Sequence, residues 1–283
     1  MRIYPEETGA LIDFEEKFSQ YLQDCRAQLG IEDDRLEEMV PKIYLDWLDK
    51  PAVWLGGKSP NAYFASLEDV KLIELLGHYV LAGIALPGPL LGCIVEKSAC
   101  TYPLLLSLMK NYDGEKSGAL KSAIVRLIEE TDLPRPYAYY IEVIAAAGEE
   151  SSFSEACADE LKGAGSDLLD CVLLAYENVK SRYAADCFLD VLADMPFDTR
   201  VYEHVLERFL YSEQHKAFYA SLLGKLGSEN ALPYLEEAMR RQSLKYYDYL
   251  AIKNAFEALG GEIEIERDFS GDEDFEALAK MGD

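Results

Sequence analysis

The stretch KAFYASLLGKLGSENALPYLEEAMRR, residues 216–241, carries the pattern on which most of the fold prediction rests. Its first half places apolar residues at helical spacing and ends at Leu226 and Gly227, and glycine there is the residue expected to form a left-handed helix stop. Its second half begins a new helix with Pro233 in the first turn, where proline is tolerated. The stretch therefore predicts two helices joined by a tight corner, each apolar on one face.

The same apolar spacing recurs along the chain with a period of about 33 residues. In one series the helical offsets 0, 3, 4 and 7 recur at starting positions that are 34 and then 33 residues apart. Its members are Ala185, Phe188, Leu189 and Leu192; Tyr219, Leu222, Leu223 and Leu226; Ile252, Ala255, Phe256 and Leu259. A second series interleaves with it: Leu169, Val172, Leu173 and Tyr176; Tyr202, Val205, Leu206 and Phe209; Leu235, Ala238 and Met239. Two series in phase predict units of two alternating helices that bury their apolar faces by stacking.

These units resemble HEAT repeats. Residues 216–241 carry the resemblance most closely, YYDYLAIKNAFEALGG (246–261) repeats the first half, and SRYAADCFLDVLADM (181–195) fits the template without the glycine. The T-P-L-H opening of ankyrin repeats and the landmarks of tetratricopeptide repeats are missing. The resemblance implies an all-α fold, an α-α superhelix of the HEAT/armadillo-like solenoid type.

The chain is predicted to have three parts. Residues 1–115 form an irregular helical N-terminal region packed on the solenoid, residues 116–261 form HEAT-like helical repeats, and residues 262–283 form an acidic C-terminal cap. The helices expected upstream are 11–29, 35–49, 63–81, 87–97 and 102–109. The stretch 75–95 lacks acids, lysine and arginine, but its central Pro87-Gly88-Pro89 predicts two packed helices rather than a membrane span.

DWLDKPAVWLGGKSPNAYF, residues 46–64, interrupts the helical pattern with both tryptophans and a Gly-Gly pair. Trp47 falls on the last turn of an apolar helix face, which predicts a core position. Gly56 and Gly57 permit a turn with positive φ, and Pro60 can begin the next helix. We expect a helix–helix corner with Trp54 packed. The alternative is a partner-binding site formed by these same five residues, with Trp54 as an exposed aromatic anchor.

This corner also resembles the toxin-binding domain of Xre/MbcA/ParS-type antitoxins. The residues that carry the resemblance are Trp47, Leu48, Pro51, Leu55, Gly56, Gly57, Ser59 and Pro60. In that family a helix ends in Trp-Leu, and a loop of the form Pro…Leu-Gly-Gly-x-Thr-Pro leads to the next helix. Ser59 stands where threonine is usual, and the family's DNA-binding helix-turn-helix has no visible counterpart here. The resemblance implies toxin neutralisation through residues 46–60.

The formal net charge is −25, and residues 51–115 contribute only −2 of it. So negative a field repels nucleic-acid phosphates and anionic membranes and favours basic protein partners. We therefore expect a protein partner with a basic surface, no nucleic acid and no membrane.

Side chains suited to catalysis or metal binding are few. The six cysteines are scattered, which predicts buried, reduced thiols rather than a metal site. His78 is expected in the core, and His204 and His215 on solvated helix faces. No G-x-S-x-G, phosphate-binding glycine loop or H-E-x-x-H is present. We expect no catalytic residues, no cofactor and no metal.

These features favour a non-catalytic, cytoplasmic binding or scaffold protein rather than an enzyme. The second hypothesis is an enzyme, or a subunit of one, with a pocket between residues 44 and 110 lined by His78, Tyr79 and cysteines. The third is toxin binding through the corner, which predicts an exposed Trp54.

Overall fold

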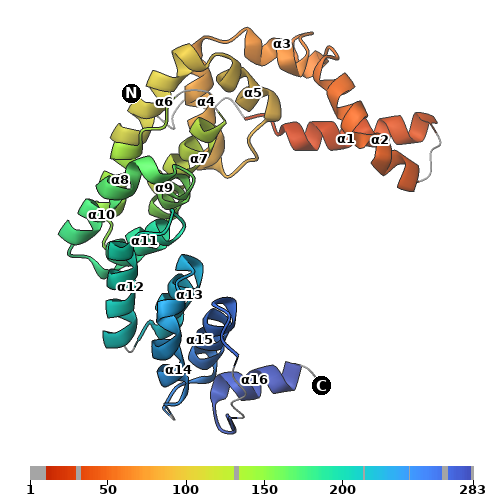
Figure 1. Cartoon of the computed structure of the whole chain (residues 1–283). Helices are drawn as coiled ribbons and strands as arrows, with labels where there is room; N and C mark the ends of the chain where they lie inside the picture. The colour runs from red at the N-terminus through yellow and green to blue at the C-terminus, as the bar shows by residue number, and fades with distance from the viewer. Residues whose placement is uncertain are drawn as a thin grey trace. The chain divides into compact units, whose positions relative to one another are not determined.

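The computed structural model describes residues 11–29, 33–130, 134–212, 214–241, 243–262 and 267–281. All regular structure in these ranges is helical, which confirms the prediction of an all-α protein (Figure 1). The chain divides into two compact units, Met1–Arg135 and Pro136–Asp283, here called unit 1 and unit 2. No helix in the described ranges is both long and apolar enough to cross a bilayer.

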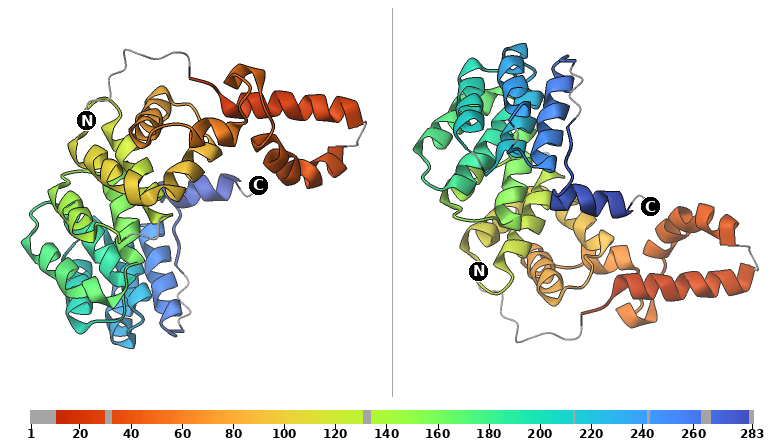
Figure 2. Two further views of the ribbon diagram at one scale, coloured as in Figure 1. Left: turned by 90° about the horizontal axis from the view of Figure 1, so that it is seen from above. Right: turned by 90° about the horizontal axis from the view of Figure 1, so that it is seen from below.

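Unit 1 contains seven α-helices and a short 3-10 helix within its described residues. They are α1 (Phe14–Leu29), α2 (Asp33–Leu48), η2 (Val53–Leu55), α3 (Pro60–Ala65), α4 (Asp69–Ala82), α5 (Gly88–Glu96), α6 (Ser98–Asn111) and α7 (Ser117–Glu129). Helices α1 and α2 lie side by side (Figures 1 and 2). Helix α4 contacts α5, α6 and α7, while α3 contacts α2 and α5. Helix α3 therefore connects the α1–α2 pair to the larger group of helices.

The stretch predicted as one helix over 63–81 is broken in the structure, so that prediction is wrong. Helix α3 ends at Ala65, where the N–H of Ser66 donates to carbonyls of the last turn. Glu68 is extended, with ψ of 149°, and α4 starts after it. The next prediction is confirmed: residues 75–95 form two helices in contact, α4 and α5, and α4 ends at Gly83 with φ of 69°.

Unit 2 consists of helices that pack in successive pairs. They are α8 (Tyr137–Ala146), α9 (Ser152–Lys162), η3 (Ser166–Leu168), α10 (Leu169–Asn178), α11 (Arg182–Ala193), α12 (Thr199–Tyr211), α13 (Lys216–Leu226), η4 (Glu229–Ala231), α14 (Leu232–Met239), α15 (Tyr246–Ala258) and α16 (Glu273–Met281). The pairs in contact are α8 with α9, α10 with α11, α12 with α13, and α14 with α15. The second helices also contact one another, α9 with α11, α11 with α13, and α13 with α15 (Figure 1).

The two apolar series form the core of unit 2. Every member is buried except Leu206, which is half-buried. The predicted helix stop is also present, because Gly227 follows α13 with φ of 69°. Pro233 lies in the first turn of α14, as expected. The predicted domain boundaries at residues 115 and 261 stay predictions.

Polar side chains join the second helices α9, α11 and α13. Asp190 on α11 pairs with Lys162 on α9 at 2.8 Å and with Lys225 on α13 at 2.9 Å. Lys225 also pairs with Asp194 at 3.2 Å. Burial acts to raise the pKa of Asp190, but the two lysines outweigh it and lower that pKa. Three neighbouring helices are thus connected through one carboxylate.

The six cysteines differ in burial, although all are free thiols. Cys93 and Cys157 are buried, as predicted, and Cys25 and Cys187 are partly buried. Cys100 and Cys171 are exposed, so the prediction of burial is wrong for these two. Each lies on the solvent-facing side of its helix, α6 or α10, where the packing of neighbouring helices does not cover it.

Candidate binding sites

The corner at residues 46–60 is held by backbone hydrogen bonds between its own two sides. The N–H of Ala52 donates to the carbonyl of Lys58 at 3.0 Å, and the N–H of Gly57 donates back to the carbonyl of Ala52 at 3.0 Å. Gly56 and Gly57 have φ of 63° and 85°, a conformation that residues with a Cβ rarely adopt. Ser59 caps α3 by accepting from the N–H of Ala62 at 3.2 Å. The corner is therefore a defined turn, with both glycines in the predicted conformation.

An aromatic cluster packs beneath the corner. Its rings belong to Phe14, Phe18, Tyr44, Trp47, Trp54 and Phe64. Trp47 is only 5% exposed and contacts Phe18 at a centroid distance of 5.3 Å and Tyr44 at 5.9 Å. These rings come from α1, α2, η2 and α3, and such ring pairs add to the stabilisation from burial. The core position predicted for Trp47 is confirmed.

The predicted partner-binding residues differ in what they present to solvent. Trp47 and Pro60 are buried, whereas Trp54 is 37% exposed and its ring contacts Phe14 at 5.4 Å. Trp54 is thus packed on one side and exposed on the other. The neighbouring Val53 is 95% exposed, and sequence reasoning missed it because nothing local distinguishes it from a core valine.

A cavity of about 400 Å³ opens beside the two tryptophans. Tyr21 and Lys50 contribute to its wall, and the Lys50 amine lies 4.7 Å from the centre of the Tyr21 ring and donates to its hydroxyl at 3.2 Å. The corner thus combines a hollow, an exposed tryptophan edge and a protruding valine.

Within residues 44–110, where an enzyme pocket was predicted, a cavity of about 400 Å³ is lined by Tyr44, Trp47 and residues 85–88 together with residues of α1, but His78 and Tyr79 do not line it. The helices around His78 and Tyr79 form a packed core. Leu72, Ile73 and Ile94 are fully buried. Tyr79 is buried and donates to the carbonyl of Ile12 at 2.8 Å, and this burial raises its pKa to about 12. His78 is half-buried on α4, so the predicted core position is wrong. The pocket lined by His78, Tyr79 and cysteines that the enzyme hypothesis predicts is therefore not among the cavities described.

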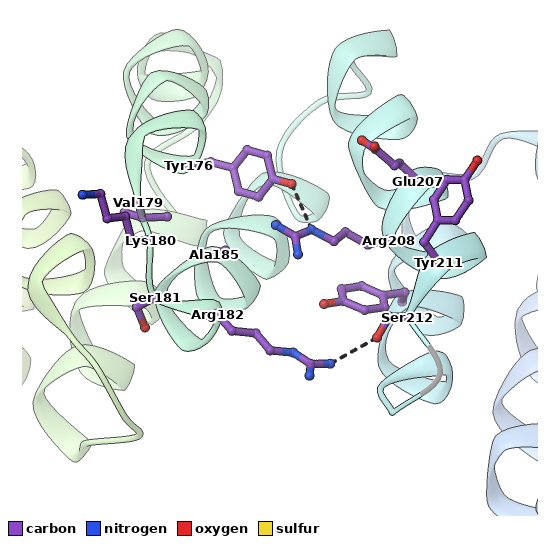
Figure 3. Close-up of a pocket in the computed structure, with 11 residues that line it drawn as sticks. Tyr176, Val179, Lys180, Ser181, Arg182, Ala185, Glu207, Arg208, Tyr211 and Ser212 are labelled. Atoms are coloured by element: carbon purple, nitrogen blue, oxygen red, sulfur yellow. Dashed lines mark hydrogen bonds between the residues drawn. The ribbon is translucent and has the colours of Figure 1, made fainter.

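A second hollow, here called the groove, lies in unit 2 between α10, α11 and α12 and measures about 550 Å³ (Figure 3). Helices α10 and α12 belong to successive pairs but are not packed closely against each other. Tyr176 on α10, Arg182 at the start of α11 and Arg208 on α12 extend side chains into the space between them (Figure 3).

Hydrogen bonds join side chains that line or border the groove. The Arg208 Nε donates to the Tyr176 hydroxyl at 3.4 Å, and the Arg182 Nη2 donates to the Ser212 Oγ at 3.1 Å (Figure 3). The Tyr219 hydroxyl donates to Asp186 at 2.5 Å. Burial, together with this hydrogen bond, raises the pKa of Tyr219 to about 12.

The other two histidines, which were predicted to lie on solvated helix faces, lie beside the groove. His204 packs the edge of its ring against Tyr176 at 4.9 Å, and the His215 Nδ1 lies 3.6 Å from Asp186. Asp186 also lies 3.7 Å from the Arg182 Nε. Both histidine side chains are partly exposed, at 31% and 45%, so neither occupies a core position.

Within the described residues, no group of three or more His, Cys, Asp or Glu side chains is placed to hold a metal ion. Comparison of the chain with protein-family models, curated proteins and solved structures gave no match. The corner and the groove are therefore the two candidate binding sites.

Proposed function

We propose that the protein is a non-catalytic binding protein, built in part as a HEAT-like α-solenoid, and that a protein partner docks at the corner of unit 1. The residues that would contact the partner are Trp54 and Val53, with Trp47, Gly56, Gly57 and Pro60 holding them in place.

The pairwise packing of α8 to α15 supports the solenoid part of the proposal. Each pair contributes one helix to a continuous row, α9, α11, α13 and α15, and each apolar face is buried against the next pair. A period of about 33 residues with nearest-neighbour packing is the organisation of helical-repeat proteins. Such proteins bind partners on extended surfaces.

The observation that carries the docking site is Val53, which is 95% exposed beside the 37% exposed Trp54. Exposed single apolar residues are common, but here two adjacent ones protrude from a turn that hydrogen bonds hold in shape. A tryptophan presented on a preorganised turn loses little conformational freedom on binding, and tryptophans are enriched among residues that dominate interface energy.

The test is capture of partners from lysate of the source cell by the tagged full chain, with quantitative mass spectrometry. We compare wild type with Val53→Asp and Trp54→Ala, and use Val70→Asp on α4 as the matched control, because Val70 is also exposed, at 46%. A partner held at the corner should be lost from the first two variants and retained by the control. Equal recovery with all four proteins would contradict the proposal.

Binding rates measured at low and high salt distinguish the electrostatic contribution of the acidic surface from the apolar contribution of the corner. Steering of a basic partner by a chain of net charge −25 weakens as salt rises, whereas apolar contacts at the corner do not. We expect slower association but a dissociation rate little changed when salt is raised. A complex that dissociates completely would mean that the acidic surface, not the corner, holds the partner.

Toxin binding is the second candidate, and the exposure of Trp54 favours it. The resemblance of residues 46–60 to the toxin-binding domain of Xre/MbcA/ParS-type antitoxins predicts an exposed Trp54, and 37% of that residue is exposed. Under this proposal the partner captured at the corner is a growth-inhibiting enzyme. Adding the full chain should then reduce its activity, and Trp54→Ala should restore it. A partner with no such activity would exclude this candidate.

A further inference from the structure

We propose that the groove of unit 2 binds the carboxylate group of a ligand between the guanidinium groups of Arg208 and Arg182. This site is separate from the corner, and the proposal does not depend on the function proposed above.

Arg208 is the first reason. Its guanidinium is partly buried, and its Nε donates a long hydrogen bond of 3.4 Å to the uncharged Tyr176 hydroxyl. Among the described residues, no carboxylate forms an ion pair with it. A partly buried arginine is stabilised by an oxyanion, because the guanidinium presents paired N–H donors that match two carboxylate oxygens.

Arg182 is the second reason, because it brings another guanidinium from the neighbouring pair of helices into the same space (Figure 3). Its Nη groups donate to uncharged acceptors, Ser212 at 3.1 Å and Gln214 at 3.2 Å. Its acidic neighbour Asp186 lies 3.7 Å from Nε. The groove is therefore bordered by two cations and several hydroxyl groups.

The charge inside the groove favours a monoanion. Of the charged side chains that line the groove, Lys180, Arg182 and Arg208 are cationic and Glu207 is anionic. Asp186 lies beside Arg182, so these five side chains together carry a charge of +1. Glu207 is exposed at the rim, and the Lys180 amine points away from the two arginines in Figure 3. One carboxylate neutralises this charge. A phosphate monoester, with a charge of about −1.5 to −2 at pH 7, would leave an excess of negative charge in an acidic protein.

The groove suits a ligand larger than the carboxylate alone. Its volume of about 550 Å³ is that of a typical small-molecule site. Tyr211 at its edge is 81% exposed and offers a ring for the body of the ligand. A free organic acid and the glutamate side chain of a peptide present the same carboxylate, so the test includes both.

The test uses the full chain labelled with ¹⁵N-arginine and follows the Nε–Hε signals of its eleven arginines. The probes are acetate, the peptide acetyl-Ala-Glu-Ala-amide and inorganic phosphate, at constant ionic strength set with chloride. Arg208→Lys and Arg182→Lys assign the two signals. We expect saturable shifts of Arg208 and Arg182 with acetate and with the peptide, at affinities at least tenfold higher than with phosphate.

Arg208→Gln should weaken acetate binding at least tenfold, and Arg208→Lys should weaken it less, since the charge remains but the paired donors are lost. Arg240→Gln is the matched control, because Arg240 already pairs with Glu236 at 2.6 Å on α14. Val53→Asp at the corner should leave binding unchanged, which separates this test from that of the proposed function.

Three outcomes would overturn the proposal: shifts with chloride alone, linear shifts shared by all arginines, or tighter binding of phosphate than of acetate. Preference for the peptide over acetate would identify a peptide-borne carboxylate, and equal affinity a free acid; both support the site. If Arg208→Gln fails to fold, as judged by circular dichroism, the Arg208→Lys and wild-type titrations still decide the result.

Discussion

Around Trp47 in unit 1 the helices meet through aromatic rings, whereas in unit 2 ion pairs and hydrogen bonds connect the second helices of successive pairs. The aromatic cluster concentrates its contacts on one side chain that touches residues from several helices. The polar contacts of unit 2 are distributed, with each one joining a helix to its neighbour. A single substitution should therefore cost unit 1 more than unit 2, and its effect should stay within the unit that contains it.

The largest effect is expected from Trp47→Ala. Removing this 5% exposed side chain leaves a cavity among the rings of α1, α2 and α3, at a cost of about 3–5 kcal/mol. Hydrogen exchange should show lost protection in these helices and unchanged protection in α8 to α15. The matched control is Trp54→Ala, which should cost about 1–2 kcal/mol because its ring is already 37% exposed. Equal costs for the two variants would show that the cluster is not centred on Trp47.

Tyr219→Phe tests a single hydrogen bond between α13 and α11. Losing the donor to Asp186 should cost about 1–2 kcal/mol in urea unfolding at pH 7. The raised pKa of Tyr219, about 12 against 10.0, means that its stabilisation is full below pH 10 and declines as pH rises from 10 through 12. The difference from wild type should therefore shrink over that range. Tyr211→Phe, at a position 81% exposed, should change nothing.

Asp190→Asn tests the ion pairs among α9, α11 and α13. We expect a loss of about 1 kcal/mol at pH 7, because the side chains are partly exposed and solvent screens them. The lowered pKa of Asp190 means that its stabilisation is present above pH 4 and is lost as pH falls through that pKa. Wild type and variant should thus converge in acid. Asp159→Asn, whose side chain is 74% exposed, is the control and should have almost no effect.

The smallest effects on stability are expected from replacing glycine by alanine at two positions in unit 1. Gly57→Ala should destabilise unit 1 by about 1 kcal/mol, because φ of 85° is strained for any residue with a Cβ. Gly92→Ala, on an exposed face of α5 where an added Cβ meets no atom within 4 Å, should stabilise it by about 0.5–1 kcal/mol. Thermal unfolding measures both, and changes of the same sign would contradict the strain at the corner.

Local features of the chain determined much of the helical architecture. The spacing of apolar residues placed α11, α13 and α15, and it identified their buried faces, because helical periodicity is a property of neighbouring residues. The positive φ angles of Gly227, Gly56 and Gly57 were also predictable, since only glycine adopts positive φ without a steric cost. The break at residues 66–68 was not predicted, because these three residues include no proline or glycine that would mark a helix end.

Exposure at the corner was decided by tertiary structure. Trp47 and Val53 are both apolar and only six residues apart, yet one is 5% and the other 95% exposed. The rings that contact Trp47 come from α1 and η2 as well as α2. Nothing near Val53 in the chain indicates that these rings leave Val53 uncovered. Burial of a side chain depends on which distant segments of the chain pack against it, and the local sequence pattern does not specify those segments.

The groove shows the same limit for charged residues. Arg208 adjoins Phe209 of one apolar series and Arg182 precedes Ala185 of the other, so the sequence by itself places each at the edge of a buried helix face. Only the stacking of helix pairs brings Arg182 and Arg208 to one space and places Tyr176 beside Arg208. The same stacking places Asp190 between two lysines. Helix periodicity acts over a few residues, whereas electrostatic contacts form between whatever side chains the fold brings together.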